Sequence, residues 1–219
     1  MSFYKGDKIM SAHNDVHLNI VCSNNEDAAK LASYLNENYD NDGEIQFQTN
    51  GFTISSEDGV IPNGNEIWIG YETGYRDIGP ENIYEFFAEL DEIAELVGVS
   101  IINVRLVFVS QEGNESIIFV KKLSNTAFDK FISEYMETCL VADDEDPKET
   151  EAKVRAEYES KIWMIVCDED SGSYDDEFAN EFDECARNII DEWEFSCDED
   201  FGMWIAALSE DGNILWDNR

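Results

Sequence analysis

Alternating apolar and polar residues predict the strands of this chain, and apolar residues three or four apart predict its helices. Residues 15–22 alternate as Asp-Val-His-Leu-Asn-Ile-Val-Cys, which is typical of a half-buried strand. The capping sequence at residues 24–27 then precedes apolar residues at helical spacing, so a helix follows this strand. The same criteria predict further strands over residues 44–48, 51–55, 66–71, 101–110, 115–122, 162–167, 203–208 and 214–216.

Four more helices are predicted. One begins at Pro80, because proline at the first helical position loses no hydrogen bond, and it runs to about Val97. The others cover about residues 127–139, 148–160 and 174–193. Hairpins interspersed with helices favour an α+β fold with antiparallel sheets and helices packed on one face, as in ferredoxin-like β-α-β-β-α-β units.

A break in the pattern divides the chain. Residues 141–147, Val-Ala-Asp-Asp-Glu-Asp-Pro, hold four adjacent acids and a proline, so we expect an acidic linker there. It would join an N-terminal α+β domain (1–140) to a strongly acidic C-terminal α+β domain (148–219). In each part a strand ending in Val-Cys precedes acids and a helix, and a Ser-Glu-Asp-Gly turn follows later. A duplication into two related halves explains this repeated pattern, and chance explains it equally well.

Composition supports a folded protein. Hydrophobic residues make up 43% of the 219 residues, which is enough for a core. No stretch approaches the roughly 18 apolar residues of a membrane span, and residues 1–8 lack the apolar core of a signal peptide. We therefore expect a cytoplasmic protein that does not bind membranes.

The sequence offers little catalytic or metal-binding chemistry. Five cysteines without a CxxC pair and only two histidines predict buried thiols and no zinc site or disulfide framework. No nucleophile elbow, Walker loop or dinucleotide fingerprint is present, so we assign no catalytic residue and no cofactor. The loops that begin at Asp168 and Asp198 have Ala179 and Ser209 where an EF-hand needs glutamate. A divalent-cation-binding protein or a hydrolase is therefore the lowest-ranked alternative.

Charge changes the picture most. The formal net charge is −36, with 24 acids and 8 bases before residue 141 and 26 acids and 6 bases after it. Phe178, Phe182, Cys185, Ile189 and Trp193 form an apolar stripe on the helix at 174–193, and acids occupy the remainder, interrupted only by Arg187. Like charges one turn apart destabilise a helix, so stability alone would favour interleaved lysines. The helix at 80–97 repeats the arrangement with Glu81, Glu85, Glu89 and Glu92.

We therefore expect partner binding by acids of the C-terminal part. The candidate residues are Asp143, Asp144, Glu145, Asp146, Asp168, Glu169, Asp170, Asp175, Asp176, Glu177, Glu181, Glu184, Asp191, Glu192, Asp198, Glu199 and Asp200. Among the five tryptophans, Trp216 is the one expected to be exposed as an interface anchor.

The spacing of these acids suggests a class of partner. Acids one helical turn apart are separated by about 5.4 Å, and phosphates on one DNA strand advance roughly 3.4 Å. In size and in these acidic runs, the chain resembles the acidic DNA-mimic inhibitors that phages and mobile elements make against restriction enzymes and CRISPR effectors. The resemblance implies a non-catalytic protein that binds the basic groove of a defence nuclease and binds no nucleic acid itself. If a phage encodes it, the bacterial host cytoplasm is its location.

Two other readings share this chemistry. An immunity or antitoxin protein would neutralise a basic nuclease toxin through the same electrostatics. A solvated acidic surface without a dedicated partner would have the same composition. The sequence does not decide which acidic face is used.

Overall fold

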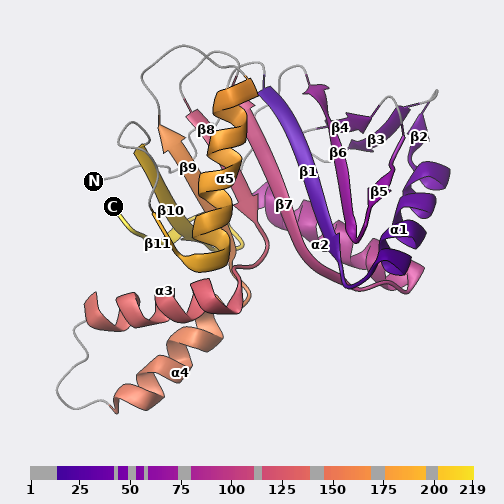
Figure 1. Ribbon diagram of the computed structural model, residues 1–219. Helices are drawn as coiled ribbons and strands as arrows, with labels where there is room; N and C mark the ends of the chain where they lie inside the picture. The colour runs from indigo at the N-terminus through magenta and orange to yellow at the C-terminus, as the bar shows by residue number, and fades with distance from the viewer. Residues whose placement is uncertain are drawn as a thin grey trace.

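The computed structural model describes residues 14–41, 44–48, 53–56, 59–73, 80–110, 115–138, 146–168, 176–195 and 202–219 (Figure 1). Eight strands form one antiparallel sheet in the order β11-β10-β9-β8-β7-β1-β6-β5. They are β1 (Asn14–Cys22), β5 (Pro62–Asn63), β6 (Glu66–Thr73), β7 (Ile101–Ser110), β8 (Glu115–Val120), β9 (Ile162–Asp168), β10 (Gly202–Leu208) and β11 (Ile214–Asp217). A second sheet contains β2 (Asp40–Asn41), β3 (Glu44–Gln48) and β4 (Thr53–Ser56).

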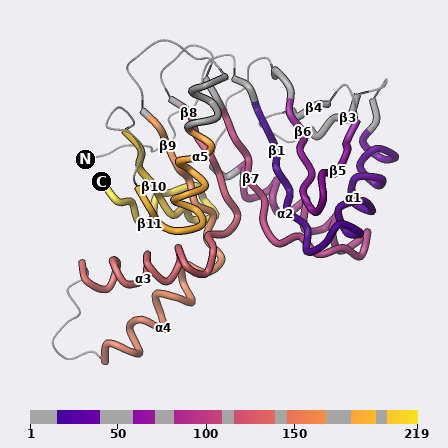
Figure 2. Tube along the Cα trace, viewed as in Figure 1, coloured from indigo at the N-terminus to yellow at the C-terminus, as the bar shows by residue number. Residues whose placement is uncertain are grey.

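Helices cover both faces of the large sheet. Helices α1 (Asn25–Asn38) and α2 (Pro80–Val97) pack on one face, over a core that includes Leu18 and Phe108. Helices α3 (Asn125–Thr138), α4 (Pro147–Tyr158) and α5 (Asp176–Glu192) belong to the core on the other face, with Val107 and Trp163. Figure 2 shows α5 in front of the sheet and α2 behind it.

The predicted α+β class with antiparallel strands is confirmed. The placement of the helices differs from the expectation of one covered face. The reason is that adjacent residues of the central strands are both apolar and both buried, as in Val107-Phe108 and Ile117-Ile118. A strand that is apolar on both sides needs a helix layer on each.

Residues 14–110 form the expected ferredoxin-like unit. Their elements β1-α1-β5-β6-α2-β7 follow the β-α-β-β-α-β order, with the strands arranged β7-β1-β6-β5 and both helices on one face. The later strands are arranged differently, since β8, β9, β10 and β11 are neighbours in chain order. The pattern repeated in the two parts of the sequence therefore does not correspond to a repeated strand order.

The large sheet is continuous across the predicted linker. Strand β8 pairs with β9 from Glu115 opposite Asp168 to Val120 opposite Trp163. Residues 141–145 lie outside the described residues, Asp146 is the N-cap of α4, and Pro147 is the first residue of that helix. The division into two domains stays a prediction, and the strands that it would separate share one ladder of hydrogen bonds.

One tyrosine ties α2 to the later strands. The hydroxyl of Tyr84 donates to the carbonyl of Leu208 at 2.6 Å and accepts from the amide of Ile162 at 3.1 Å. Burial raises the pKa of Tyr84 above its ordinary value. Both backbone partners are buried residues at the ends of β10 and β9.

We expect the substitution Tyr84→Phe to lower the free energy of unfolding by about 1–3 kcal/mol, because it leaves a buried carbonyl and a buried amide without this partner. Urea denaturation measures the change. Tyr34→Phe on α1 is the control, because its ring is half-buried against Tyr39 and it should cost little. Equal losses in the two variants would contradict the bridging role of Tyr84.

An aromatic cluster brings together side chains from α3, α4, β9, β11 and the residue after α5. The ring centroid of Phe131 on α3 lies 4.7 Å from that of Trp163, 4.9 Å from Trp216, 5.2 Å from Tyr158 and 5.5 Å from Trp193. Trp216 is therefore half-buried within this cluster, and its predicted role as an exposed anchor is wrong. It was misassigned because β11 lies at the sheet edge, where α3 covers it.

Within the described ranges, none of the helices is both long and apolar enough to cross a membrane. The hydrophobic sequence is instead used in the two cores. The apolar stripe predicted on α5 is confirmed where its side chains are described, because Phe182, Cys185, Ile189 and Trp193 are buried.

Candidate acidic interface

The candidate acids are distributed over three places. Asp176, Glu177, Glu181, Glu184, Asp191 and Glu192 lie on α5, and Asp168 ends β9. Asp146 precedes α4 at the end of that helix remote from the sheet (Figure 1). The remaining candidates lie outside the described residues, namely Asp143, Asp144, Glu145, Glu169, Asp170, Asp175, Asp198, Glu199 and Asp200.

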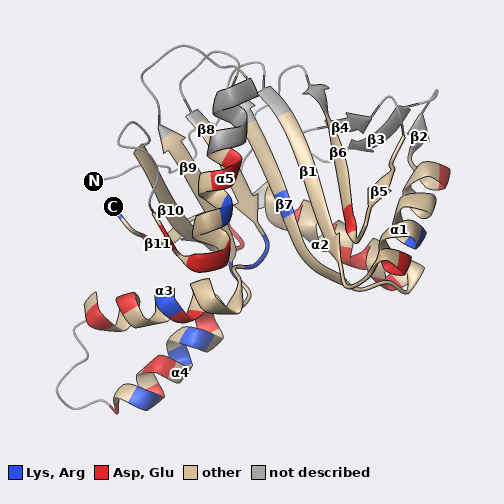
Figure 3. Cartoon of the chain, viewed as in Figure 1, with Lys and Arg blue, Asp and Glu red and all other residues tan. Residues whose placement is uncertain are grey.

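Asp146 has a structural role of its own. Its carboxylate accepts a hydrogen bond from the amide of Lys148 at 3.0 Å, so it caps the N-terminus of α4. Helix α4 itself has three acids and three bases, so both red and blue segments lie along it in Figure 3. Two of these bases pair within the arm: Lys153 with Glu149 at 3.1 Å, and Arg155 with Glu151 at 2.9 Å and with Asp129 of α3 at 2.7 Å. Helix α4, with its balanced charges, therefore does not extend the acidic surface.

Helix α5 carries seven acids and one base. The two acids of its last turn have cationic neighbours. An Asp191 oxygen lies 3.7 Å from Arg105 on β7, and a Glu192 oxygen lies 3.9 Å from Nζ of Lys130 on α3. Lys130 also donates to the backbone carbonyl of Glu192 at 2.7 Å, where a cation complements the helix dipole. These acids fix the end of α5, whereas Glu184, nearer the middle of the helix, is exposed.

Acidic residues also occupy paired positions at the end of the sheet where β9 finishes. The register places Glu115 opposite Asp168 and, further across the sheet, Asp15 opposite Glu72. Like charges directly opposite each other on neighbouring strands are destabilising. The register thus gathers acidic residues at this end of the sheet, an arrangement that stability alone does not favour.

Helix α2 is the second acidic helix. It has six acids and no base. Lys121 forms an ion pair with Asp91, and the hydroxyl of Tyr39 donates to Glu89 at 3.4 Å. Burial, together with the charge of Glu89, raises the pKa of Tyr39 to about 12. Because α2 and α5 lie on opposite faces of the sheet, their acids form two separate surfaces (Figure 3).

Among the described residues, no group of three or more His, Cys, Asp or Glu side chains could hold a metal ion. Cys22, Cys167 and Cys185 are buried thiols, and Cys139 and Cys197 lie outside the described residues. Burial, with a smaller contribution from Asp27, raises the pKa of Cys22 to about 11, which keeps this thiol protonated at neutral pH.

The structure adds a set of residues that sequence reasoning missed. Trp68, Asn19 and Arg105 form a cross-strand row on β6, β1 and β7, and Trp68 is 39% exposed. The row arises from the register that places Asn19 opposite both Trp68 and Arg105, so no local signal in the sequence indicates it. No protein-family model, curated protein or solved structure matches the chain.

Proposed function

We propose that the protein is a non-catalytic inhibitor that mimics nucleic acid and occupies the basic DNA- or RNA-binding groove of a cytoplasmic defence nuclease of the CRISPR or restriction type. The observation that carries the proposal is α5, a helix with seven acids and one base whose apolar side is buried against the sheet. Its charges are therefore attached to a fixed backbone.

The rigidity of this support matters for affinity. A disordered acidic tail would lose conformational entropy on binding, whereas a helix packed on a sheet loses little. Seven acids in the 17 residues of α5, added to those at the adjoining sheet end, approach the linear charge density of a nucleic-acid strand. A lysine- and arginine-lined groove would find in them comparable anionic partners, and the charge of −36 would speed the encounter.

The internal pairing of α5 limits the surface that binds. Asp191 and Glu192 already have Arg105 and Lys130 as neighbours, so the first half of the helix is the proposed contact. Asp146 is excluded because it caps α4. The proposed contact therefore comprises Asp176, Glu177, Glu181 and Glu184, together with the acidic sheet end at Asp168.

The proposal predicts a salt-dependent complex. Tagged protein is used to capture partners from cells that encode it, and the affinity for the captured protein is measured at several salt concentrations. Raising the salt from about 0.05 to 0.2 M should weaken the complex by about tenfold or more, because salt screens the ion pairs at this surface. Duplex DNA or RNA should compete for the same site.

Two results would speak against this mechanism. An affinity independent of salt would indicate an apolar interface. A captured nuclease whose activity is blocked while its nucleic-acid binding persists would indicate an immunity protein that covers a toxin's active site.

A further inference from the structure

The row formed by Trp68, Asn19 and Arg105 lies on a face of the sheet where polar side chains need partners. Leu18 and Ile20 point into the core under α1 and α2, so Asn19 between them lies on the face that α5 shares. Asn19 is 1% exposed and donates to a Glu66 carboxylate oxygen at 3.3 Å. The indole of Trp68 donates to the same oxygen at 3.1 Å. Glu66 is thus already engaged by two donors.

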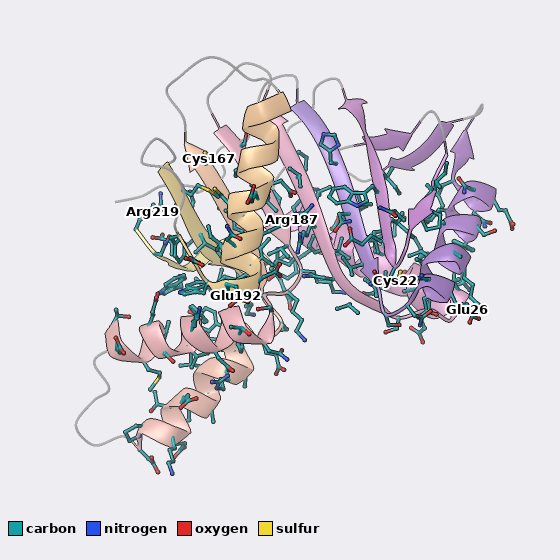
Figure 4. All side chains as sticks on the ribbon, in the orientation of Figure 1. Cys22, Glu26, Cys167, Arg187, Glu192 and Arg219 are labelled. Carbon is teal, nitrogen blue, oxygen red and sulfur yellow. The ribbon has the colours of Figure 1, made fainter. Side chains whose placement is uncertain are left out.

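Helix α5 brings a second guanidinium to this row. The guanidinium carbon of Arg187 lies 5.7 Å from the ring centroid of Trp68, and its Nε lies 2.7 Å from an Asp183 oxygen. A terminal nitrogen of Arg105 lies 3.7 Å from an Asp191 oxygen. Figure 4 shows Arg187 on the side of α5 that faces β7. Residues of the ferredoxin-like unit and of α5 therefore meet around two arginines.

Neither arginine is satisfied by these neighbours. The Nε atoms of Arg105 and Arg187 are buried, and no residue in the described part of the chain accepts a hydrogen bond from either. The 2.7 Å contact of Arg187 with Asp183 is an ion pair whose angle does not make a hydrogen bond, and the 3.7 Å contact of Arg105 is too long for one. Buried donors nearly always have an acceptor, so this pair requires an explanation.

The electrostatics agree with incomplete pairing of Arg105. Its side chain is only 12% exposed. Burial lowers its pKa, Arg187 lowers it further, and Asp191, Asp183 and Glu66 act in the opposite direction. An additional oxygen acceptor would compensate for the lost hydration of this guanidinium.

We propose that Arg105 and Arg187 bind an oxyanion, the carboxylate or phosphate group of a small ligand, beside the exposed ring of Trp68. A guanidinium offers a planar fork of donors that matches either group. The ligand would displace the carboxylate of Asp191, which is 54% exposed and can turn to solvent. Trp68 would contact the body of the ligand. This site uses the scarce cations of the chain and is independent of the proposed inhibitor function.

The test follows the Nε–Hε signals of the arginines by NMR while inorganic phosphate, or separately acetate, is added at an ionic strength held near 0.15 M with NaCl. We expect saturable shifts at Arg105 and Arg187. Arg155 and Arg219 are internal references, because carboxylates already bind them. The anion that saturates the shifts identifies the favoured group. Shifts of equal size in all four arginines, or no saturation by about 10 mM of either anion, would overturn the proposal.

Two variants are expected to change the affinity for the anion in opposite directions. Arg105→Lys should weaken binding of the effective anion by about tenfold, the loss of one charge-assisted hydrogen bond. Asp191→Asn should strengthen it by about fivefold, because a competing charge some 4 Å away is removed even if water screens it fully. If these residues only hold α5 in place, Asp191→Asn should not raise the affinity for the anion. An unchanged or lower affinity in this variant would therefore refute the site. Backbone amide spectra of both variants verify that the fold is retained.

Discussion

Phe131→Ala is expected to lower the free energy of unfolding by about 3–5 kcal/mol, the cost of removing a large buried ring whose cavity collapses only in part. Phe131 is fully buried and contacts rings from α3, α4, β9, β11 and the residue after α5. Those surrounding rings are large and rigid, which limits collapse. Denaturant unfolding followed by tryptophan fluorescence measures the loss, since three tryptophans belong to the cluster or adjoin it.

Phe128→Ala is the matched control on the same helix. Phe128 is half-buried, and its ring centroid lies 6.0 Å from that of Phe131. The guanidinium carbon of Arg155 lies 6.0 Å from the same Phe128 centroid. Water can fill the space that its removal leaves, so a smaller loss is expected. Similar losses at the two positions would show that the cluster does not centre on Phe131.

Reversing the charge on α5 is expected to abolish partner binding if the inhibitor proposal holds. The variant replaces Asp176, Glu177, Glu181 and Glu184 with lysine. We expect the affinity for the captured partner to fall at least about a hundredfold at low salt, because attractive contacts become repulsive. The fold should persist, since the buried side of the helix is untouched. Affinity measurement with a thermal unfolding control checks both statements.

Helix α2 supplies the control for total charge. Replacing Glu81, Glu85, Glu92 and Glu95 with lysine adds the same eight positive units to the formal charge of −36, but on the opposite face of the sheet. This variant should retain most of the affinity. If both reversals weaken binding equally, net charge and not the α5 surface is responsible. If only the α2 reversal does so, the assigned face is wrong.

Elements with strong periodicity could be predicted closely from the sequence. Helix α2 begins at Pro80 and ends at Val97, and β7 covers residues 101–110, both as expected. Strands β2 and β5 were missed because two residues carry no periodicity. Adjacent apolar residues such as Ile117-Ile118 indicate the helix layer on the second face. Both residues of such a pair are buried, whereas a strand with one exposed face would alternate apolar and polar residues.

The candidate interface was less accessible to sequence reasoning. The burial of the α5 stripe follows from spacing alone. The cations beside Asp191 and Glu192 come from β7 and α3, far away in the sequence, so only the folded arrangement identifies these two acids as internally paired. The row of Trp68, Asn19 and Arg105 depends on strand register, which no local pattern contains.

The lengths of the outermost strands affect how the protein behaves at high concentration. The large sheet ends in β5 and β11, which have two and four residues. Short edge strands present few backbone groups to a strand from another molecule, so edge-to-edge aggregation has little to build on. Beyond β11, the side-chain oxygen of Asn218 accepts a hydrogen bond from the backbone amide of Ile205. The backbone amide of Asn218 donates to the carbonyl of Ile205, and these two bonds complete the pairing between β10 and the end of the chain. With the long-range repulsion between acidic molecules, this edge favours a protein that resists fibril formation even when it is abundant.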